Sequence, residues 1–333
     1  MQTPRLAVII PCFNEELCVE KTVNKLLEVL KMLFEKDKIT SDSYLYLVDD
    51  GSVDSTWEII ERLHLANTEH VKAMKFVRNY GNQKALTAGL EGVNKIGCDC
   101  CISIDADLQQ DENSIENFVD AFVEGHDIVL GVRNDRKGDS FFKKTTAVLF
   151  YKVMNLLGAK IPMNHSDYRL VSKKALQIMQ MYPEKALFLR GFFHEVGLKT
   201  KIVKFNVKPR FAGESKFNFM SLMTLALNGI TSFSVVPLRI IAVLGFIMFI
   251  GSILVGLETI FEKVFFNDSP NGYATAIIML SFFGGLQLFC LGVIGEYVGQ
   301  VYREVKSRPR YIAERCWSSI SPTNECISPS MKG

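Results

Sequence analysis

The sequence lacks the two glycine-rich signatures that most often bind nucleotide phosphates. No GxGxxG motif follows a predicted strand, and no GxxxxGK[ST] motif occurs in the 333 residues. The first absence argues against a dinucleotide-dependent dehydrogenase, and the second argues against a P-loop NTPase. If the chain binds a nucleotide, its phosphates need another kind of partner.

The sequence also lacks a large excess of basic charge and the paired cysteines of a zinc site, and we expect no N-terminal signal peptide. The formal net charge is only +2, so we expect no nucleic-acid partner. Three of the eight cysteines cluster at Cys98, Cys100 and Cys101, but without a paired CxxC or a nearby histidine, so we expect reduced thiols. The apolar run 6–10 stops at Pro11, which is too short for a signal peptide.

Strand and helix patterns alternate through the first part of the chain. Short apolar strands are predicted at 6–10, 44–48, 71–77, 100–104 and 127–132, and amphipathic helical patterns separate the first four. At this spacing, the alternation predicts a parallel sheet with right-handed crossovers.

Acidic residues follow three of the predicted strands, namely Glu15, Asp50 and the pair Asp105 and Asp107. Because the carboxyl ends of parallel strands meet at one edge, we expect these carboxylates to share one cleft. Asp105, Asp107 and Gln109 offer hard oxygen ligands from a single turn, which suits Mg²⁺ or Mn²⁺ bound together with phosphate oxygens. Acidic groups without a glycine cradle favour a metal-bridged diphosphate.

An EF-hand calcium loop is the alternative interpretation of the same turn. Asp105 and Glu116 would take its first and last ligand positions. However, Gln110 stands where that loop needs glycine for its sharp turn, and a strand precedes the turn instead of a helix. We therefore reject the EF-hand.

Three motifs together resemble family 2 glycosyltransferases of the GT-A fold: Pro-Cys-Phe-Asn-Glu at 11–15, Val-Asp-Asp-Gly-Ser at 48–52 and Asp-Ala-Asp-Leu-Gln at 105–109. The resemblance runs from about residue 5 to 309. More narrowly, the chain resembles polyprenyl-phosphate (bactoprenol or dolichol phosphate) glycosyltransferases, relatives of dolichol-phosphate mannose synthase. It implies an α/β fold with a Rossmann-like, mostly parallel GT-A sheet at 1–216, followed by a two-helix transmembrane hairpin.

The resemblance also assigns roles to individual residues. The nucleotide-sugar site would comprise Pro11, Phe13, Glu15, Val48, Asp50, Asp105, Ala106, Asp107, Arg133, Arg210 and Lys216. The metal would be held by Asp105, Asp107 and Gln109. Asp107 would also be catalytic. Separately from the resemblance, we expect catalytic roles for Asp167 and Arg169, because their place after the amphipathic pattern at 138–158 would put them between the nucleotide and the membrane, and we expect Arg169 and Arg136 to meet the acceptor phosphate.

Some of these assignments have a simpler structural alternative. Arg133 and Arg136 are also compatible with an ordinary solvated surface, and Asp167 and Arg169 with a structural ion pair. We expect the last two on a loop at 164–169, where Ser166 replaces the glycine usual in relatives and leaves the loop geometry open. Phe13 stands where tyrosine is frequent, which keeps a stacking face and loses a hydroxyl.

The second half of the chain has long stretches without charge. Transmembrane helices are predicted at about 235–257 and 274–297, each long enough for a hydrocarbon core of roughly 30 Å. A juxtamembrane helix is expected at 217–234, and the amphipathic pattern at 138–158 fits an interfacial helix or a core-facing one. The segment 301–333 reads as a basic, then disordered tail.

Charge around the predicted spans indicates their orientation. The short loop between them is acidic, whereas Arg303, Lys306 and Arg308 follow the second span. By the positive-inside rule, both termini and the catalytic domain are expected on the cytoplasmic side of the plasma (inner) membrane, in a multi-pass topology. Gly284, Gly285 and Gly292 would allow close helix packing within the hairpin or in a homo-oligomer.

The resemblance therefore implies transfer of a sugar, expected as a UDP-linked hexose, from a nucleotide-diphosphate sugar to polyprenyl phosphate for cell-envelope glycan modification. Two alternatives stay open. A processive polysaccharide synthase shares the fold, although the Gln-x-x-Arg-Trp signature is absent. A non-catalytic membrane scaffold is the other, although the intact acidic motif argues against it.

Overall fold

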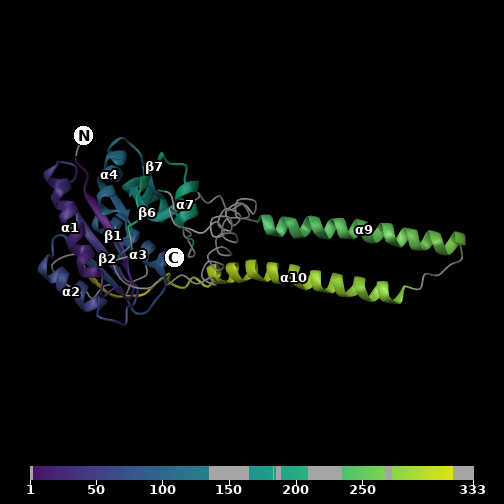
Figure 1. Ribbon diagram of the computed structural model, residues 1–333. Helices are drawn as coiled ribbons and strands as arrows, with labels where there is room; N and C mark the ends of the chain where they lie inside the picture. The colour runs from purple at the N-terminus through teal and green to yellow at the C-terminus, as the bar shows by residue number, and fades with distance from the viewer. Residues whose placement is uncertain are drawn as a thin grey trace. The chain divides into compact units, whose positions relative to one another are not determined.

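The computed structural model describes residues 3–134, 165–182, 184, 189–208, 235–266 and 272–317. These residues fall into two compact units, of which the first contains the sheet and the second contains two long helices (Figure 1). The strands of the first unit are β1 (Leu6–Cys12), β2 (Tyr44–Asp49), β3 (Val71–Phe76), β4 (Cys100–Ser103), β5 (Ile128–Arg133), β6 (His165–Ser172), β7 (Thr200–Phe205) and β8 (Ala313–Trp317). Its helices are α1 (Val19–Glu35), α2 (Thr56–Ala66), α3 (Asn82–Ile96), η1 (Glu112–Ser114), α4 (Ile115–Val123), α6 (Lys173–Gln180) and α7 (Leu189–Glu195).

The described strands form one mixed sheet in the order β7-β5-β6-β4-β1-β2-β3-β8. β1 lies near the middle and pairs in parallel with β2 and with β4, and β2 pairs in parallel with β3. β6 runs antiparallel between β4 and β5, and β8 runs antiparallel to β3 at the edge. The sheet is therefore the mostly parallel α/β sheet that the sequence predicts.

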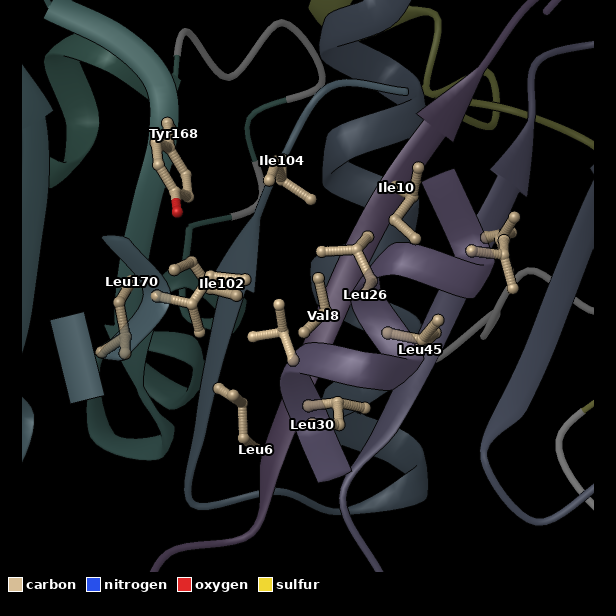
Figure 2. Close-up of a cluster of buried hydrophobic side chains, with 14 of the residues drawn as sticks. Leu6, Val8, Ile10, Leu26, Leu30, Leu45, Ile102, Ile104, Tyr168 and Leu170 are labelled. Carbon is tan, nitrogen blue, oxygen red and sulfur yellow. The ribbon is translucent and has the colours of Figure 1, made fainter. Parts of the chain in front are cut away.

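One face of the sheet packs against α1, α2 and α4. Alternate residues of β1 point to this face and meet the apolar side of α1, as Figure 2 shows. The labelled side chains of this cluster are Leu6, Val8, Ile10, Leu26, Leu30, Leu45, Ile102, Ile104, Tyr168 and Leu170. Their burial supplies much of the free energy of folding, at about 2 kcal/mol for each large aliphatic side chain.

The opposite face packs against α3, α6 and α7. α3 lies very close to the sheet at Gly89, where an added Cβ would be 2.4 Å from Cγ2 of Ile9. The central strands are thus covered on both faces, which explains why they read as continuous apolar runs.

The predicted strands of the first unit are confirmed with small changes in their bounds, and two other predictions are wrong. Residues expected on a loop at 164–169 lie on β6, and part of the tail expected to be disordered forms β8. The polar residues at the start of β6 lie beyond Ser103, the last residue of β4, and therefore beside the polar turn that follows β4. β8 is short and charged because it is an edge strand.

The second unit contains α9 (Val236–Phe266) and α10 (Tyr273–Val305), which lie side by side in Figure 1. In the part of the chain that the structure describes, one stretch has the length and hydropathy to cross a membrane: Phe282–Val305 of α10, with 24 residues and a mean hydropathy of 1.4. Val236–Met248 of α9 is apolar but shorter. The expected membrane span is thus supported for α10, and the second span stays a prediction. The expected helices at 138–158 and 217–234 lie outside the described residues.

The backbone conformation and close surroundings of Gly51 leave no room for a side chain at this position. Its φ is +68°, and an added Cβ would lie 2.3 Å from the carbonyl carbon of Arg78. Gly51→Ala should therefore lower the free energy of unfolding by more than about 2 kcal/mol, through backbone strain and the clash together. Denaturant unfolding of the full chain in detergent measures this change.

Gly125→Ala is the matched control. Gly125 also has a positive φ, +95°, but nothing lies within 4 Å of the added Cβ. Its substitution should cost only about 1 kcal/mol, the strain term alone. Equal losses for the two variants would contradict the clash.

Candidate functional site

The turn that follows β4 is held against β6 by the side chain of Gln110. Its amide nitrogen donates to Oδ2 of Asp105 at 2.6 Å and to the hydroxyl of Ser166 at 3.2 Å. Its amide oxygen accepts the backbone N–H of Asp105 at 3.1 Å. Gln110 is 2% exposed, so these bonds form away from competing water. They fix the Asp105 carboxylate at the carboxyl end of the sheet.

The rest of the turn is equally constrained. Leu108 adopts a positive φ of 55°, and the backbone N–H of Gln109 donates to Oδ1 of Asp107 at 3.1 Å. The hydroxyl of Thr22 on α1 donates to the carbonyl of Ala106 at 2.6 Å. Asp107 is only 8% exposed. Asp105, Asp107 and Gln109 therefore share one rigid turn, as the sequence predicts.

Lys208, which follows β7, holds the end of this turn through both its backbone and its side chain. Its backbone N–H donates to the carbonyl of Gln109 at 2.8 Å, and its ammonium contacts Asp111 at 3.0 Å and Glu112 at 2.6 Å. Burial works against the charge of the ammonium, but the two carboxylates outweigh it and raise the pKa of Lys208. Burial of Asp111 raises its pKa, but the contact with the Lys208 ammonium outweighs this effect and holds the pKa below its usual value.

The ends of β1 and β2 are joined by bonds from side chains to the backbone. The N–H of Asn14 donates to the hydroxyl of Ser52 at 2.9 Å, and the N–H of Glu15 donates to that of Thr56 at 2.8 Å. Ser52 in turn donates to Asp49, which is fully buried, and burial raises the pKa of Asp49 to about 6. Asp49 thus belongs to the framework of the loop.

Asp50 anchors the loop before α3. Its two carboxylate oxygens accept the backbone N–H groups of Tyr80, at 2.6 Å, and Gly81, at 2.8 Å. Burial raises the pKa of Asp50, whereas these two bonds lower it and leave a smaller net rise. On the exposed side, the Arg78 guanidinium lies 4.5 Å from the Tyr80 ring centroid and the Lys84 ammonium 5.5 Å.

Asp167 and Arg169 lie on β6 and form a buried ion pair. Nη2 of Arg169 donates to Oδ1 of Asp167, and Nη1 donates to the carbonyl of Leu189 at 2.9 Å. Arg169 is 2% exposed and Asp167 is 7% exposed. The surroundings differ from the loop that we expected, because Arg169 lies on a strand and faces the layer of α7, with its guanidinium 5.6 Å from the Phe193 ring centroid.

The other predicted residues occupy different kinds of position. Pro11, Phe13 and Glu15 are half-buried at the end of β1, and Arg133 is the half-buried last residue of β5. Because β6 separates β5 from β4 in the sheet, Arg133 lies two strands from the acidic turn. The side chain of Val48 is fully buried toward α3, and its backbone lies between β1 and β3 inside the sheet. Arg136, Arg210 and Lys216 lie outside the described residues.

Sequence reasoning missed Gln110, Thr22 and Lys208, and it treated Ser166 as a source of doubt. The hydroxyl of Ser166 accepts from Gln110 and from the backbone N–H of Tyr168, so it is part of the site framework. Gln110 carried a usable signal, since it directly follows the acidic motif. Lys208 carried none, because its contacts join segments about a hundred residues apart.

The donor set of the acidic turn fits a hard divalent cation. Two carboxylates and one side-chain amide offer only oxygen ligands, and the remaining positions would fall to substrate or water. Among the described residues, no group of three or more histidine, cysteine, aspartate or glutamate side chains is arranged to hold a metal ion. An ion would therefore need ligands from a bound diphosphate as well, which is the usual arrangement for Mg²⁺.

Comparison with known proteins agrees with this geometry. Residues 7–178 match the family described as Glycosyl transferase family 2, and residues 236–301 match the GtrB C-terminal hairpin. The chain is 44% identical over 326 residues to the uncharacterized glycosyltransferase YkoT of Bacillus subtilis, which covers 98% of this chain and 94% of the relative. It is 36% identical over 315 residues to a prophage bactoprenol glucosyl transferase homolog of Escherichia coli, with 93% and 99% covered.

A solved structure of glucosyl-3-phosphoglycerate synthase from Mycobacterium tuberculosis aligns with a TM-score of 0.44 and 16% identity, over 68% of this chain and 78% of that one. The family match spans β1 to α6, including the acidic turn after β4, and the relatives match over nearly their whole lengths. The chain therefore belongs to glycosyl transferase family 2 and is a glycosyltransferase.

Proposed function

We propose that this protein transfers a sugar, a UDP-linked hexose, from its nucleotide diphosphate to polyprenyl phosphate at the cytoplasmic face of the plasma membrane. The observation that carries the proposal is the joining, in one chain, of a carboxylate-bearing sheet edge to two long apolar helices. A lipid-linked acceptor explains why a sugar-transfer site is attached to such helices. Relatives named bactoprenol glucosyl transferase match both parts together, which supports the same acceptor class.

The acidic turn would serve the leaving group. Asp107, with Asp105 and Gln109, would hold Mg²⁺ or Mn²⁺, which when bound stabilises negative charge on a diphosphate. The bonds of Gln110 and Lys208 keep this turn in place before substrate arrives, so little reorganisation is needed. Arg133, Arg210 and Lys216 would add positive charge on the diphosphate side.

The acceptor phosphate is itself the nucleophile. One of its oxygens forms the new bond to the anomeric carbon while the bond from that carbon to the diphosphate oxygen breaks, which inverts the anomeric centre. The second pKa of a phosphate monoester is about 6, so this oxygen is mostly deprotonated at neutral pH. A strong general base is therefore unnecessary, and Asp167 would orient the sugar or take a proton from a monoprotonated acceptor.

The buried state of Arg169 changes its proposed role. A guanidinium that is 2% exposed and bound to Asp167 and to the Leu189 carbonyl has no open face for a phosphate in this structure. We propose that it acts as a positioning residue that fixes the Asp167 carboxylate. Arg136 stays a proposed acceptor-phosphate ligand.

A radiolabel assay tests the proposed reaction. UDP- and GDP-sugars are supplied one at a time with polyprenyl phosphate to the full chain in membranes or detergent. Transfer of label into an organic-soluble, acid-labile lipid supports the proposal. Label in a water-insoluble polymer would assign the protein to the processive synthases instead, and no transfer with any donor would favour a scaffold.

Asp107→Asn should remove most of the transfer activity and weaken Mn²⁺ binding, because it replaces a charged oxygen ligand with a neutral amide. Calorimetric titration with Mn²⁺ in the presence of UDP provides a readout that does not depend on turnover. Asp120→Asn is the matched control, since it removes the same charge from a surface ion pair with Lys38. Full activity of Asp107→Asn in excess chelator would exclude the metal role.

Asp167→Asn should lower kcat at neutral pH with little change in either KM. If Asp167 accepts a proton from the acceptor, the loss should be largest below the acceptor pKa of about 6 and should shrink as the pH rises through that value, because the acceptor then loses its proton unaided. An orienting role predicts no such recovery.

Arg169→Lys should also lower kcat, because a lysine cannot reproduce the two directed bonds of the guanidinium. The KM for lipid phosphate should stay nearly constant. A raised KM for lipid phosphate with unchanged kcat would assign Arg169 directly to the acceptor. Normal kinetics in both Asp167→Asn and Arg169→Lys would make the pair purely structural.

We further propose that α9 and α10 both cross the membrane with their connecting loop outside. A cysteine introduced by Asn271→Cys, a position outside the described residues, should react with an impermeant thiol reagent applied to intact cells. The control is Glu35→Cys on the exposed side of α1, which should react only after lysis. Labelling of the first variant only after lysis would reverse the topology.

A further inference from the structure

We propose that the segment 309–317, which returns from the helices to the sheet unit, positions the loop that carries Tyr80 and Gly81 against Asp50. Tyr311 is the positioning residue. The segment lies within the sheet unit, and β8 pairs with β3 directly before this loop. The inference goes beyond the proposed function, but its kinetic consequence rests on that function, because Asp50 lies in the proposed nucleotide site.

The segment is attached to the sheet unit by several independent contacts. The Arg310 guanidinium pairs with Glu91 of α3 at 2.7 Å and donates to the backbone carbonyls of Tyr182 and Glu184. The hydroxyl of Tyr311 donates to the second carboxylate oxygen of Glu91 at 2.7 Å. Both donors meet one half-buried carboxylate, so Glu91 fixes the point at which the chain rejoins the sheet unit.

A chain of aromatic contacts leads from this point to the loop. The Tyr311 ring stacks on Phe76 at a centroid distance of 4.9 Å, and Phe76 meets Tyr80 edge-on at 5.6 Å. Phe76 is fully buried, and the N–H of the neighbouring Val77 donates to the carbonyl of Ile312 at 3.2 Å. The returning segment therefore contacts both the side-chain layer and the backbone just ahead of the loop.

The last step reaches the proposed nucleotide site. The backbone N–H groups of Tyr80 and Gly81 are the two donors that satisfy the Asp50 carboxylate. If Phe76 and Tyr80 lose the support of Tyr311, these donors become less well placed and Asp50 is less constrained. Because a close-packed interior transmits strain, and the partly buried Tyr311 and Tyr80 both pack on the fully buried Phe76, loss of the Tyr311 ring is expected to change the position of Tyr80.

Trp317, on the same returning segment, offers a matched control. It packs on the other face of the sheet, where its ring lies 4.9 Å from Trp57 and 4.8 Å from His64. Removing either aromatic ring lowers stability, but of the two residues only Tyr311 contacts Phe76, which in turn contacts Tyr80.

Hydrogen exchange of the full chain in detergent tests the inference without relying on activity. Tyr311→Leu should speed exchange of the Tyr80 and Gly81 amides by about fivefold, the factor that the loss of one aromatic pair can account for. Tyr311→Phe keeps the ring and should stay near the rate of the unmodified chain. Trp317→Leu should leave both amides unchanged even if its melting temperature falls as far. Unchanged exchange in Tyr311→Leu, or equal exchange in Trp317→Leu, overturns the proposal.

Calorimetric titration with UDP or GDP in the presence of Mn²⁺ tests the consequence for nucleotide binding. Tyr311→Leu should raise the Kd of the nucleotide that the unmodified chain binds by a similar factor, about fivefold. If the unmodified chain binds neither nucleotide, the proposed function fails while the exchange result still decides this inference. Should Tyr311→Leu not fold, Glu91→Ala removes the acceptor of both Arg310 and Tyr311 and should speed exchange of the same two amides, and no change there counts against the proposal.

Discussion

The parallel pairing of β1 with both β2 and β4 is the constraint on which the site depends. Its register sets Cys12 beside Asp49 and Ile9 beside Ser103, so the turns after all three strands leave the same edge of the sheet. A slip of one residue would exchange the β1 side chains that meet α1 with those that meet α3, and the close fit of Ile9 against Gly89 does not permit this exchange. Packing of apolar side chains therefore decides where the carboxylates lie.

At that edge, Gln110 and Asp50 have their polar groups satisfied by neighbouring residues before any substrate is present, whereas Oδ2 of the buried Asp49 has no hydrogen-bond partner among the described residues. Gln110 uses both ends of its amide on Asp105 and Ser166, and Asp50 uses both oxygens on backbone N–H groups. Buried polar groups without partners would cost about 1–3 kcal/mol each, so these bonds keep the turns in one arrangement. The described turns after β2 and β4 are thus held to the sheet unit by these bonds.

Much of this could be predicted from the sequence, because the information was local. The apolar strands and the acidic residues after them, such as Asp50 and Asp105, follow from periodicity and from the rule that parallel strands end at one edge. β6 and β8 could not be predicted in this way. Both are antiparallel strands with polar sequences, and their place depends on partners far along the chain, such as Ser103 opposite Arg169 and Ala73 opposite Trp317. The burial of Arg169 has the same origin, since Leu189 supplies one of its partners.

The buried pair of Asp167 and Arg169 is difficult to explain by stability alone. Removing two charges from water costs several kcal/mol, and well-packed apolar residues of similar size are often at least as stabilising. Breaking such a pair is costly, however, so once present it holds its members in fixed positions. Here it lies on the strand beside the acidic turn, and Ser103 on β4 donates to the carbonyl of Asp167. An arrangement that adds little stability but sets the position of one carboxylate next to the site is expected where that carboxylate faces a substrate. The physical cost of the pair therefore supports the proposal that Asp167 takes part in the reaction.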